Sequence, residues 1–188
     1  MGKILVAALV GGLVMFMWEF VAHMMLPLGE MGMRQPTNED VVLDAVKTGF
    51  PTAGIYFIPS ITPEKMQDEA AAKAWSEKSL ASPYAFVVYD PVGRDPGAMG
   101  PYLGKQFGSD VLAALVIALV MSLGAVAVGR GALVGAGFGA FSTLAVVVPH
   151  WNWYRFPADY LVGQGITQIV GWALAGLAIA FVLRRRRA

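Results

Sequence analysis

One acidic residue and two histidines are the residues in this sequence whose types and spacing suit chemistry. Glu19 precedes His23 by four residues, so on a helix both side chains lie on one face, about one turn apart. A carboxyl group inside a long apolar segment is costly to bury and is by default a candidate functional group. Such burial favours a protonated carboxyl group, or one paired with a cation such as His23 or Arg155. His150, the second histidine, ends another apolar segment.

Four apolar segments must position these side chains. Only 14% of the residues are charged, whereas an average soluble domain carries roughly 25%, which indicates a chain largely embedded in lipid. Each segment is close to the roughly 20 residues that a helix needs to cross the hydrocarbon core. The sequence therefore predicts an all-α membrane protein with a small α+β domain inserted between its first two transmembrane helices. The predicted transmembrane helices are residues 3–28, 110–128, 131–149 and 158–183.

Basic residues predict the orientation of these helices. With four spans, both chain ends lie on one side of the membrane, together with the turn that contains Arg130. That side carries Lys3, Arg130 and the arginine run at 184–187, and no acidic residue. Basic residues near helix ends are retained in the cytoplasm. We therefore expect a multi-pass protein of the bacterial inner membrane, with both termini cytoplasmic, a basic tail at 184–188 and a periplasmic domain at 29–109.

The inserted segment, residues 29–109, is rich in charge, proline and turn residues. A capping residue followed by acidic residues is typical of a helix start near residue 38, and a second such signal predicts a helix at 62–78. Aromatic and β-branched residues at 54–59 and 84–89 predict two strands. We expect the order helix, strand, helix, strand, followed by an irregular segment that is rich in glycine and proline.

The predicted orientation brings both histidines to a similar depth near the outer face of the membrane. The short loop between the third and fourth helices adds charged and aromatic side chains at that depth. Aromatic side chains are also common at membrane interfaces without any ligand. The candidate ligand-binding residues of this layer are Glu19, His23, Glu30, His150, Trp151, Tyr154, Arg155 and Asp159.

Three hypotheses for this layer stay open. In the first, Glu19, His23 and His150 form a hydrogen-bonded cluster that joins the first and third helices. In the second, His23 and His150 bind a metal ion or are the axial ligands of a haem, because imidazole suits zinc, copper and iron. In the third, the layer binds a quinone or a lipid headgroup, or Glu19 relays protons. The cofactor is therefore open between none, haem and copper.

Glycines and amides predict how the helices pack. Gly131, Gly135 and Gly139 recur at intervals of four, which is typical of a glycine zipper that another helix approaches closely. That helix belongs either to the same chain or to another subunit. Gln164 and Gln168 share one helix face, which we expect to look into the bundle. Their role is either hydrogen bonding between helices or the lining of a polar pathway.

No feature of the sequence identifies a reaction, and the chain is not indicated to be an enzyme. The absence of cysteine excludes disulfides, thiolate metal sites and cysteine nucleophiles. Nucleic acid is not an expected partner, because the one basic run directly follows a hydrophobic helix. The sequence favours a structural or interaction role, as an accessory or assembly subunit of a larger membrane complex, with the lipid bilayer and other membrane subunits as partners. The alternatives are a haem- or metal-binding redox or metal-handling protein, and a quinone-, lipid- or proton-binding one.

One substitution follows from the predicted layer. Replacing Glu19 by lysine would place a buried cation beside His23, and we expect that change to impair folding. Normal yield and melting of that variant would contradict the expectation.

Overall fold

The computed structural model describes residues 1–124 and 126–184 and divides the chain into two compact units. The helical unit comprises Met1–Met33 and Gly97–Ala188, and the inserted unit comprises Arg34–Pro96. Of the predicted basic tail, only Arg184 lies within the described residues. Each of the two units is compact by itself.

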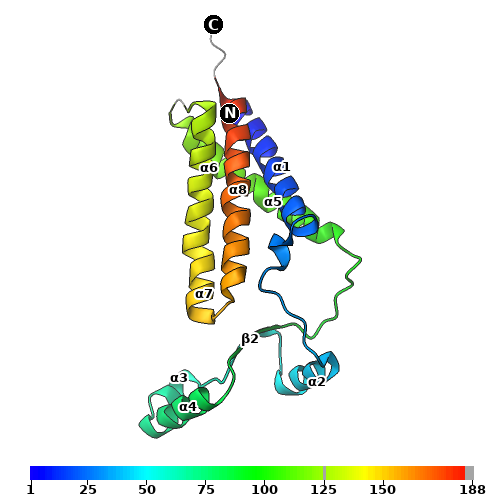
Figure 1. The fold of residues 1–188 in the computed structure, drawn as a ribbon, viewed down its shortest axis with the longest axis vertical. Helices are drawn as coiled ribbons and strands as arrows, with labels where there is room; N and C mark the ends of the chain where they lie inside the picture. Colours follow the sequence, from blue (N-terminus) through cyan, green and yellow to red (C-terminus); the bar gives the residue numbers. More distant parts are fainter. Residues whose placement is uncertain (125, 185–188) are drawn as a thin grey trace. The chain divides into compact units, whose positions relative to one another are not determined.

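The helical unit contains four helices that are long and apolar enough to cross a membrane, as the sequence predicts. The third of these runs without interruption from α6 through a π-helical turn, η2, into α7, and a short 3₁₀ helix, η1, follows α1 (Figure 1). The bounds are α1 (Gly2–Met24), η1 (Pro27–Glu30), α5 (Gly100–Ser122), α6 (Val128–Ser142), η2 (Thr143–Val147), α7 (Val148–Tyr154) and α8 (Ala158–Leu183).

Small residues in the centre and large apolar residues outside explain how these helices pack. Helix α8 lies against both α6 and α1, and α1 also packs along α5. Leu5, Leu9 and Leu13 recur every four residues on α1 and are exposed, which suits contact with lipid. The buried core consists of Ala7, Met15, Ala114, Ile117, Ala118, Met121, Trp172, Ala175, Ile179 and Ala180.

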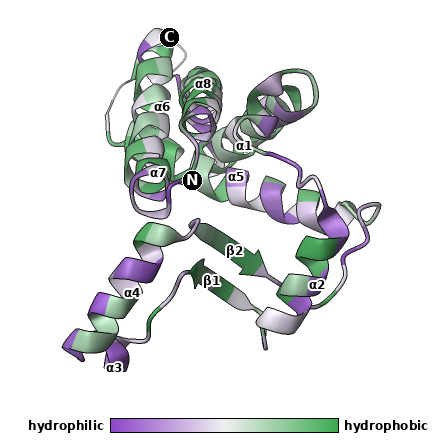
Figure 2. Cartoon of the chain, turned by 60° about the horizontal axis from the view of Figure 1, so that its bottom comes forward, coloured by the Kyte–Doolittle hydropathy of each residue, from purple (hydrophilic) through white to green (hydrophobic). Residues whose placement is uncertain are grey.

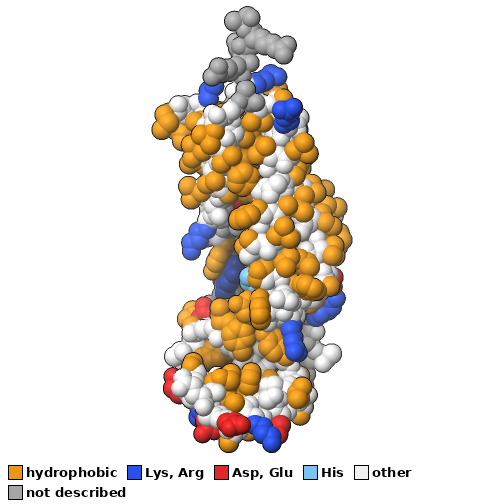
Figure 3. All heavy atoms as spheres, turned by 90° about the vertical axis from the view of Figure 1, so that its left-hand side faces the viewer, with side chains coloured by type: hydrophobic (Ala, Val, Ile, Leu, Met, Phe, Trp, Pro, Cys, Tyr) orange, Lys and Arg blue, Asp and Glu red, His pale blue; other side chains and the backbone are white. Residues whose placement is uncertain are grey.

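Basic side chains flank one end of the helical unit (Figure 3). The start of α1, the start of α6 and the end of α8 lie at the same end of the helical unit (Figure 1). Lysine and arginine side chains gather at this end, whereas hydrophobic side chains cover much of the surface of the helices (Figure 3). This arrangement is what an even number of membrane spans with flanking basic residues requires.

Helix α5 is longer than the sequence indicates. It begins at Gly100, and the prediction of an irregular segment up to residue 109 is wrong. Pro101 stands in the first turn, where its missing N–H group would have no helical partner in any case. The polar first turns of α5 fall outside the apolar stretch from which the predicted span was drawn. Asp110 is therefore near the middle of this helix and not at its mouth.

The inserted unit combines three helices with a two-stranded antiparallel sheet. Its elements are α2 (Glu39–Gly49), β1 (Gly54–Ile58), α3 (Pro63–Met66), α4 (Glu69–Ala81) and β2 (Ala85–Tyr89). Asn38 caps α2, since its side chain accepts a hydrogen bond from the N–H of Val41. The single helix predicted at 62–78 is wrong, because Asp68 accepts from the N–H of Ala71 and so starts a new helix, α4.

The sheet of the inserted unit is apolar along both strands (Figure 2). Phe50, at the end of α2, stacks on Tyr56 with ring centroids 4.1 Å apart. In the strand register Ile55 lies opposite Val88, and these two side chains are 60% and 72% exposed. Because side chains alternate along a strand, Ile55 and Val88 share one face of the sheet with the pair Phe57 and Phe86.

Candidate functional site

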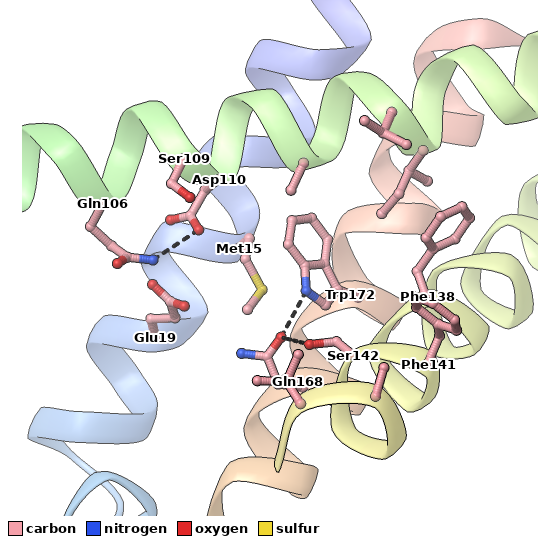
Figure 4. A pocket seen from close by; sticks show the side chains of 15 residues that line it. Met15, Glu19, Gln106, Ser109, Asp110, Phe138, Phe141, Ser142, Gln168 and Trp172 are labelled. Atoms are coloured by element: carbon pink, nitrogen blue, oxygen red, sulfur yellow. Dashed lines mark hydrogen bonds between the residues drawn. The ribbon is translucent and has the colours of Figure 1, made fainter. Parts of the chain in front are cut away.

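A cavity of about 540 Å³ lies among α1, α5, α6, η2 and α8, all within the helical unit (Figure 4). Its walls are largely apolar, and they include aromatic and methionine side chains from three helices. Two groups of polar side chains interrupt this surface. The polar lining residues are Glu19, Gln106, Ser109, Asp110, Ser142 and Gln168.

Asp110 is the most deeply buried ionisable group of this cavity, with 4% of its surface exposed. The side-chain amide of Gln106, one turn earlier on α5, donates a hydrogen bond to Asp110 Oδ1 over 3.0 Å. Asp110 Oδ2 is buried and has no donor among the described residues. An acceptor left without a donor in an apolar environment is costly, so this oxygen is a position where a ligand or a proton would be stabilising.

The carboxyl group of Glu19 approaches Asp110 from the neighbouring helix α1. Both side chains line the same end of the cavity, and the Glu19 carboxyl group points toward Gln106 and Asp110 (Figure 4). Two negative charges this close in a medium of low polarity repel each other strongly. A proton shared by the two carboxyl groups, or a bound cation, would relieve that repulsion. The lining of the cavity holds no lysine, arginine or histidine that would do so.

A second polar group lies on the opposite wall of the cavity. Gln168 Oε1 accepts hydrogen bonds from Trp172 Nε1 over 3.0 Å and from the Ser142 hydroxyl over 3.4 Å. These two donors fix the amide so that its nitrogen points away from them (Figure 4). The cavity therefore has carboxyl oxygens at one end, an oriented amide at the other, and apolar side chains between them.

Two backbone features shape the cavity. A Cβ at Gly12 would lie 2.7 Å from the Val111 Cα atom, so only glycine allows α1 to approach α5 this closely. Val111 follows Asp110, which together with Glu19 forms what we call the acidic pair. On the other wall, Ala145 and Val146 line the cavity from the π-helical turn η2. Pro149 follows that turn and has no N–H to continue the regular hydrogen-bond pattern. Turns of this type are frequent at functional sites.

The glycine-rich face of α6 lies against α8 of the same chain. A Cβ at Gly131 would lie 2.6 Å from the carbonyl oxygen of Gly176, and one at Gly139 would lie 2.7 Å from the Ile169 Cα atom. At Gly135 a Cβ would collide with the carbonyl oxygen of Trp172. Gln164 is half-buried on α8, one turn before Gln168. This close helix contact holds Gln168 and Trp172 against Ser142.

His23 interacts with its own helix and with the short helix that follows. Its Nδ1 atom lies 2.9 Å from the backbone carbonyl oxygen of Glu19, and not on the Glu19 carboxyl group. The imidazole ring packs on Gly29, where a Cβ would collide with it. Glu30 is the neighbouring residue and is exposed. The sequence predicts that Glu19 and His23 share a helix face. In the structure the imidazole ring of His23 contacts the backbone of Glu19 and not its carboxyl group.

His150 belongs to an aromatic cluster at the turn from α7 to α8. Its Nδ1 atom lies 2.7 Å from the carbonyl oxygen of Val146, and its ring contacts those of Tyr154 and Phe156 edge-on. Of the other predicted residues, Trp151 is exposed, Arg155 adopts a left-handed backbone conformation that ends α7, and Asp159 lies in the first turn of α8.

The structure links neither histidine to the acidic pair. Among residues 1–124 and 126–184, no three histidine, aspartate or glutamate side chains gather in a way that could hold a metal ion. The hypotheses of a shared metal or haem at His23 and His150, and of a cluster joining them to Glu19, therefore stay predictions.

Sequence reasoning missed Gln106 and Asp110. Their spacing of four residues, the same as that between Glu19 and His23, indicates a shared helix face and was the available signal. No protein-family model, curated protein or solved structure matches this chain.

Proposed function

We propose that this multi-pass membrane protein binds a small amphiphilic molecule in the cavity between α1, α5, α6 and α8. The observation that carries the proposal is Asp110, a residue of the cavity lining whose buried oxygen Oδ2 has no donor among the described residues. A ligand with a polar head that donates hydrogen bonds would satisfy this oxygen. Its apolar body would lie against Met15, Phe138 and Trp172.

The route of entry follows from the exposure of the cavity walls. Val116, Phe141 and Val146 line the cavity and are also exposed at the surface of the helices. In a bilayer this surface faces lipid, so a ligand dissolved in the membrane reaches the cavity without crossing water. An entry route from the lipid supports a lipophilic ligand over a polar metabolite. Of the hypotheses drawn from the sequence, it favours the one in which the protein binds a quinone, a lipid or a proton.

A pocket-filling variant tests the proposal. Ala145 lines the cavity without taking part in its polar groups, and Ala145→Phe should fill part of the volume. The neighbouring Leu144 is exposed and lies outside the lining, so Leu144→Phe is the matched control. We expect a photoreactive phenylalkyl amine to label the wild type and Leu144→Phe in α5 or α6, and Ala145→Phe much less. Equal labelling of all three proteins would contradict the proposal.

A second function is supported by a different observation, the apolar sheet face of the inserted unit. We propose that Ile55 and Val88 dock another membrane subunit, which would make the chain an accessory or assembly subunit. Their replacement by lysine should abolish co-purification of that subunit in mild detergent. Leu80→Lys, a change at an exposed position of α4, should leave co-purification intact. Isolation of the wild type as a lone chain under these conditions would remove this candidate.

The orientation of the chain completes the proposal. We propose the inner membrane of a bacterium, with Lys3, Arg130 and Arg184 on the cytoplasmic side, because basic residues near helix ends resist translocation. The inserted unit would then be periplasmic, since the chain enters and leaves it through α1 and α5, which each cross the membrane once. The labelling experiment in the Discussion tests this orientation.

A further inference from the structure

The acidic pair has a consequence for the kind of ligand that the cavity selects. Glu19 and Asp110 present two carboxyl groups at the same end of the cavity (Figure 4), and Gln106 donates one hydrogen bond to Asp110. From the facing helices the lining adds only Ser142, Gln168 and Trp172 as polar groups. Within the described ranges 1–124 and 126–184, Glu19 and Asp110 are therefore the only titratable residues that line the cavity.

We infer that the ligand head is a cation, such as a protonated amine, and that it exchanges with a proton held between Glu19 and Asp110. The inference rests on the proposed function and specifies the ligand of the same cavity. In the empty site, a proton shared by the two carboxyl groups satisfies Asp110 Oδ2 and reduces the charge of the pair. When the cation binds, its N–H groups donate to the carboxyl oxygens instead.

The exchange balances in charge and in protons. One cation enters the site, one proton leaves to the solvent, and the net charge inside the membrane is unchanged. This matters because an uncompensated charge among apolar helices is expensive, whereas a substitution of one positive charge for another is not. A neutral ligand gains no such exchange, because the pair keeps its proton when that ligand binds.

The apolar part of the cavity limits the size and shape of the cation. About 540 Å³ is enough for a phenylalkyl body, and the largely apolar walls offer a hydrated ion few hydrogen-bond partners. Phe138 and Trp172 present aromatic surfaces that also attract cations. The ligand class is therefore a lipophilic monovalent amine.

A comparison of two probes of similar shape tests the inference on the full chain. Binding of 4-phenylbutylamine and of 4-phenylbutanol is measured by equilibrium dialysis in mild detergent, from about pH 5.5 to about pH 8.5, where the amine stays protonated. We expect the affinity for the amine to rise with pH by up to about tenfold per pH unit, because one proton leaves for each cation bound. The affinity for the alcohol should not change with pH.

Each outcome separates the inference from the proposed function. Binding of both probes without pH dependence would overturn the cation–proton exchange and leave the binding function standing. Binding of neither probe would overturn the binding function itself. Asp110→Asn should bind the amine much more weakly and without pH dependence, whereas Glu77→Gln, which removes an exposed carboxyl group of α4, should keep both the affinity and its pH dependence. An unchanged pH dependence in Asp110→Asn would also contradict the inference.

Discussion

Glu19 on α1 and Asp110 on α5 present their carboxyl groups at the same end of the cavity, where Gln106 donates to Asp110 Oδ1 over 3.0 Å (Figure 4). Gly12 allows the two helix backbones to approach closely beside them. The pair faces an otherwise largely apolar cavity, and no basic side chain is part of that lining. Such a pair requires a proton or a cation to relieve the repulsion between its two negative charges.

Replacing Glu19 by lysine tests which side chain lies opposite it. The sequence alone predicts impaired folding, because the new cation would lie beside His23. With Asp110 opposite, we expect Glu19→Lys to fold, since the lysine pairs with the Asp110 carboxylate. Adding Asp110→Asn removes that partner and should lower stability by about 3 kcal/mol, the typical cost of an unpaired buried charge. Thermal unfolding in detergent compares the two variants, and equal stability would contradict the pairing.

The contact between α6 and α8 predicts opposite effects at two nearby glycines. Gly135→Ala places a methyl group against the carbonyl oxygen of Trp172 and should lower the free energy of unfolding by about 1–3 kcal/mol. At Gly137 there is open space, so Gly137→Ala should be neutral or stabilise the helix by up to about 1 kcal/mol. Thermal unfolding of both variants is the measurement. A neutral Gly135→Ala would show that the helices do not pack this closely.

The polar group on the far wall of the cavity predicts a hydrogen-bond loss. Gln168→Leu removes the acceptor of Trp172 Nε1 and of the Ser142 hydroxyl. We expect a loss of about 1 kcal/mol in stability, because hydrogen bonds between membrane helices contribute modestly. Gln164→Leu, on the same helix but outside the cavity lining, is the matched control and should cost less. If Trp172→Phe and Gln168→Leu were additive in a double-mutant cycle, the two side chains would not be coupled.

The aromatic stack of the inserted unit predicts a local loss of stability. Phe50→Ala removes the ring that stacks on Tyr56 and contacts Tyr89 edge-on. Since the two units pack separately, we expect the change to promote unfolding of Arg34–Pro96 and to leave the helical unit intact. Limited proteolysis should then cleave the inserted unit of the variant sooner, with unchanged protection of α8. If the inserted unit of Phe50→Ala resisted the protease as long as that of the wild type, the aromatic stack would not stabilise this unit.

The absence of cysteine makes the proposed orientation simple to test. Single cysteines at Gly129, where there is open space for a side chain, and at Ser76, an exposed position of α4, report the two sides of the membrane. In intact cells a membrane-impermeant thiol reagent should label Ser76→Cys and not Gly129→Cys. The reverse pattern would invert the orientation, and labelling of both positions would contradict four spans.

Part of this architecture was accessible from the sequence. Apolar segment length gave the four spans, and aromatic and β-branched runs gave the two strands, because both signals are local. Glu19 was recognisable as a candidate because an acid within an apolar segment is costly. Asp110 was not, because the polar first turns of α5 moved it to the edge of the predicted span. Its pairing with Glu19 depends on how glycines such as Gly12 set the helix contacts, which no local pattern encodes.

The most direct test of the binding site is the thermal unfolding of the full chain with and without 4-phenylbutylamine. We expect the amine to raise the unfolding temperature of the wild type and of Glu77→Gln equally, because a ligand that binds only the folded state stabilises it. Asp110→Asn should fold and show little or no increase. An increase in Asp110→Asn equal to that of the wild type would contradict a binding site at the acidic pair.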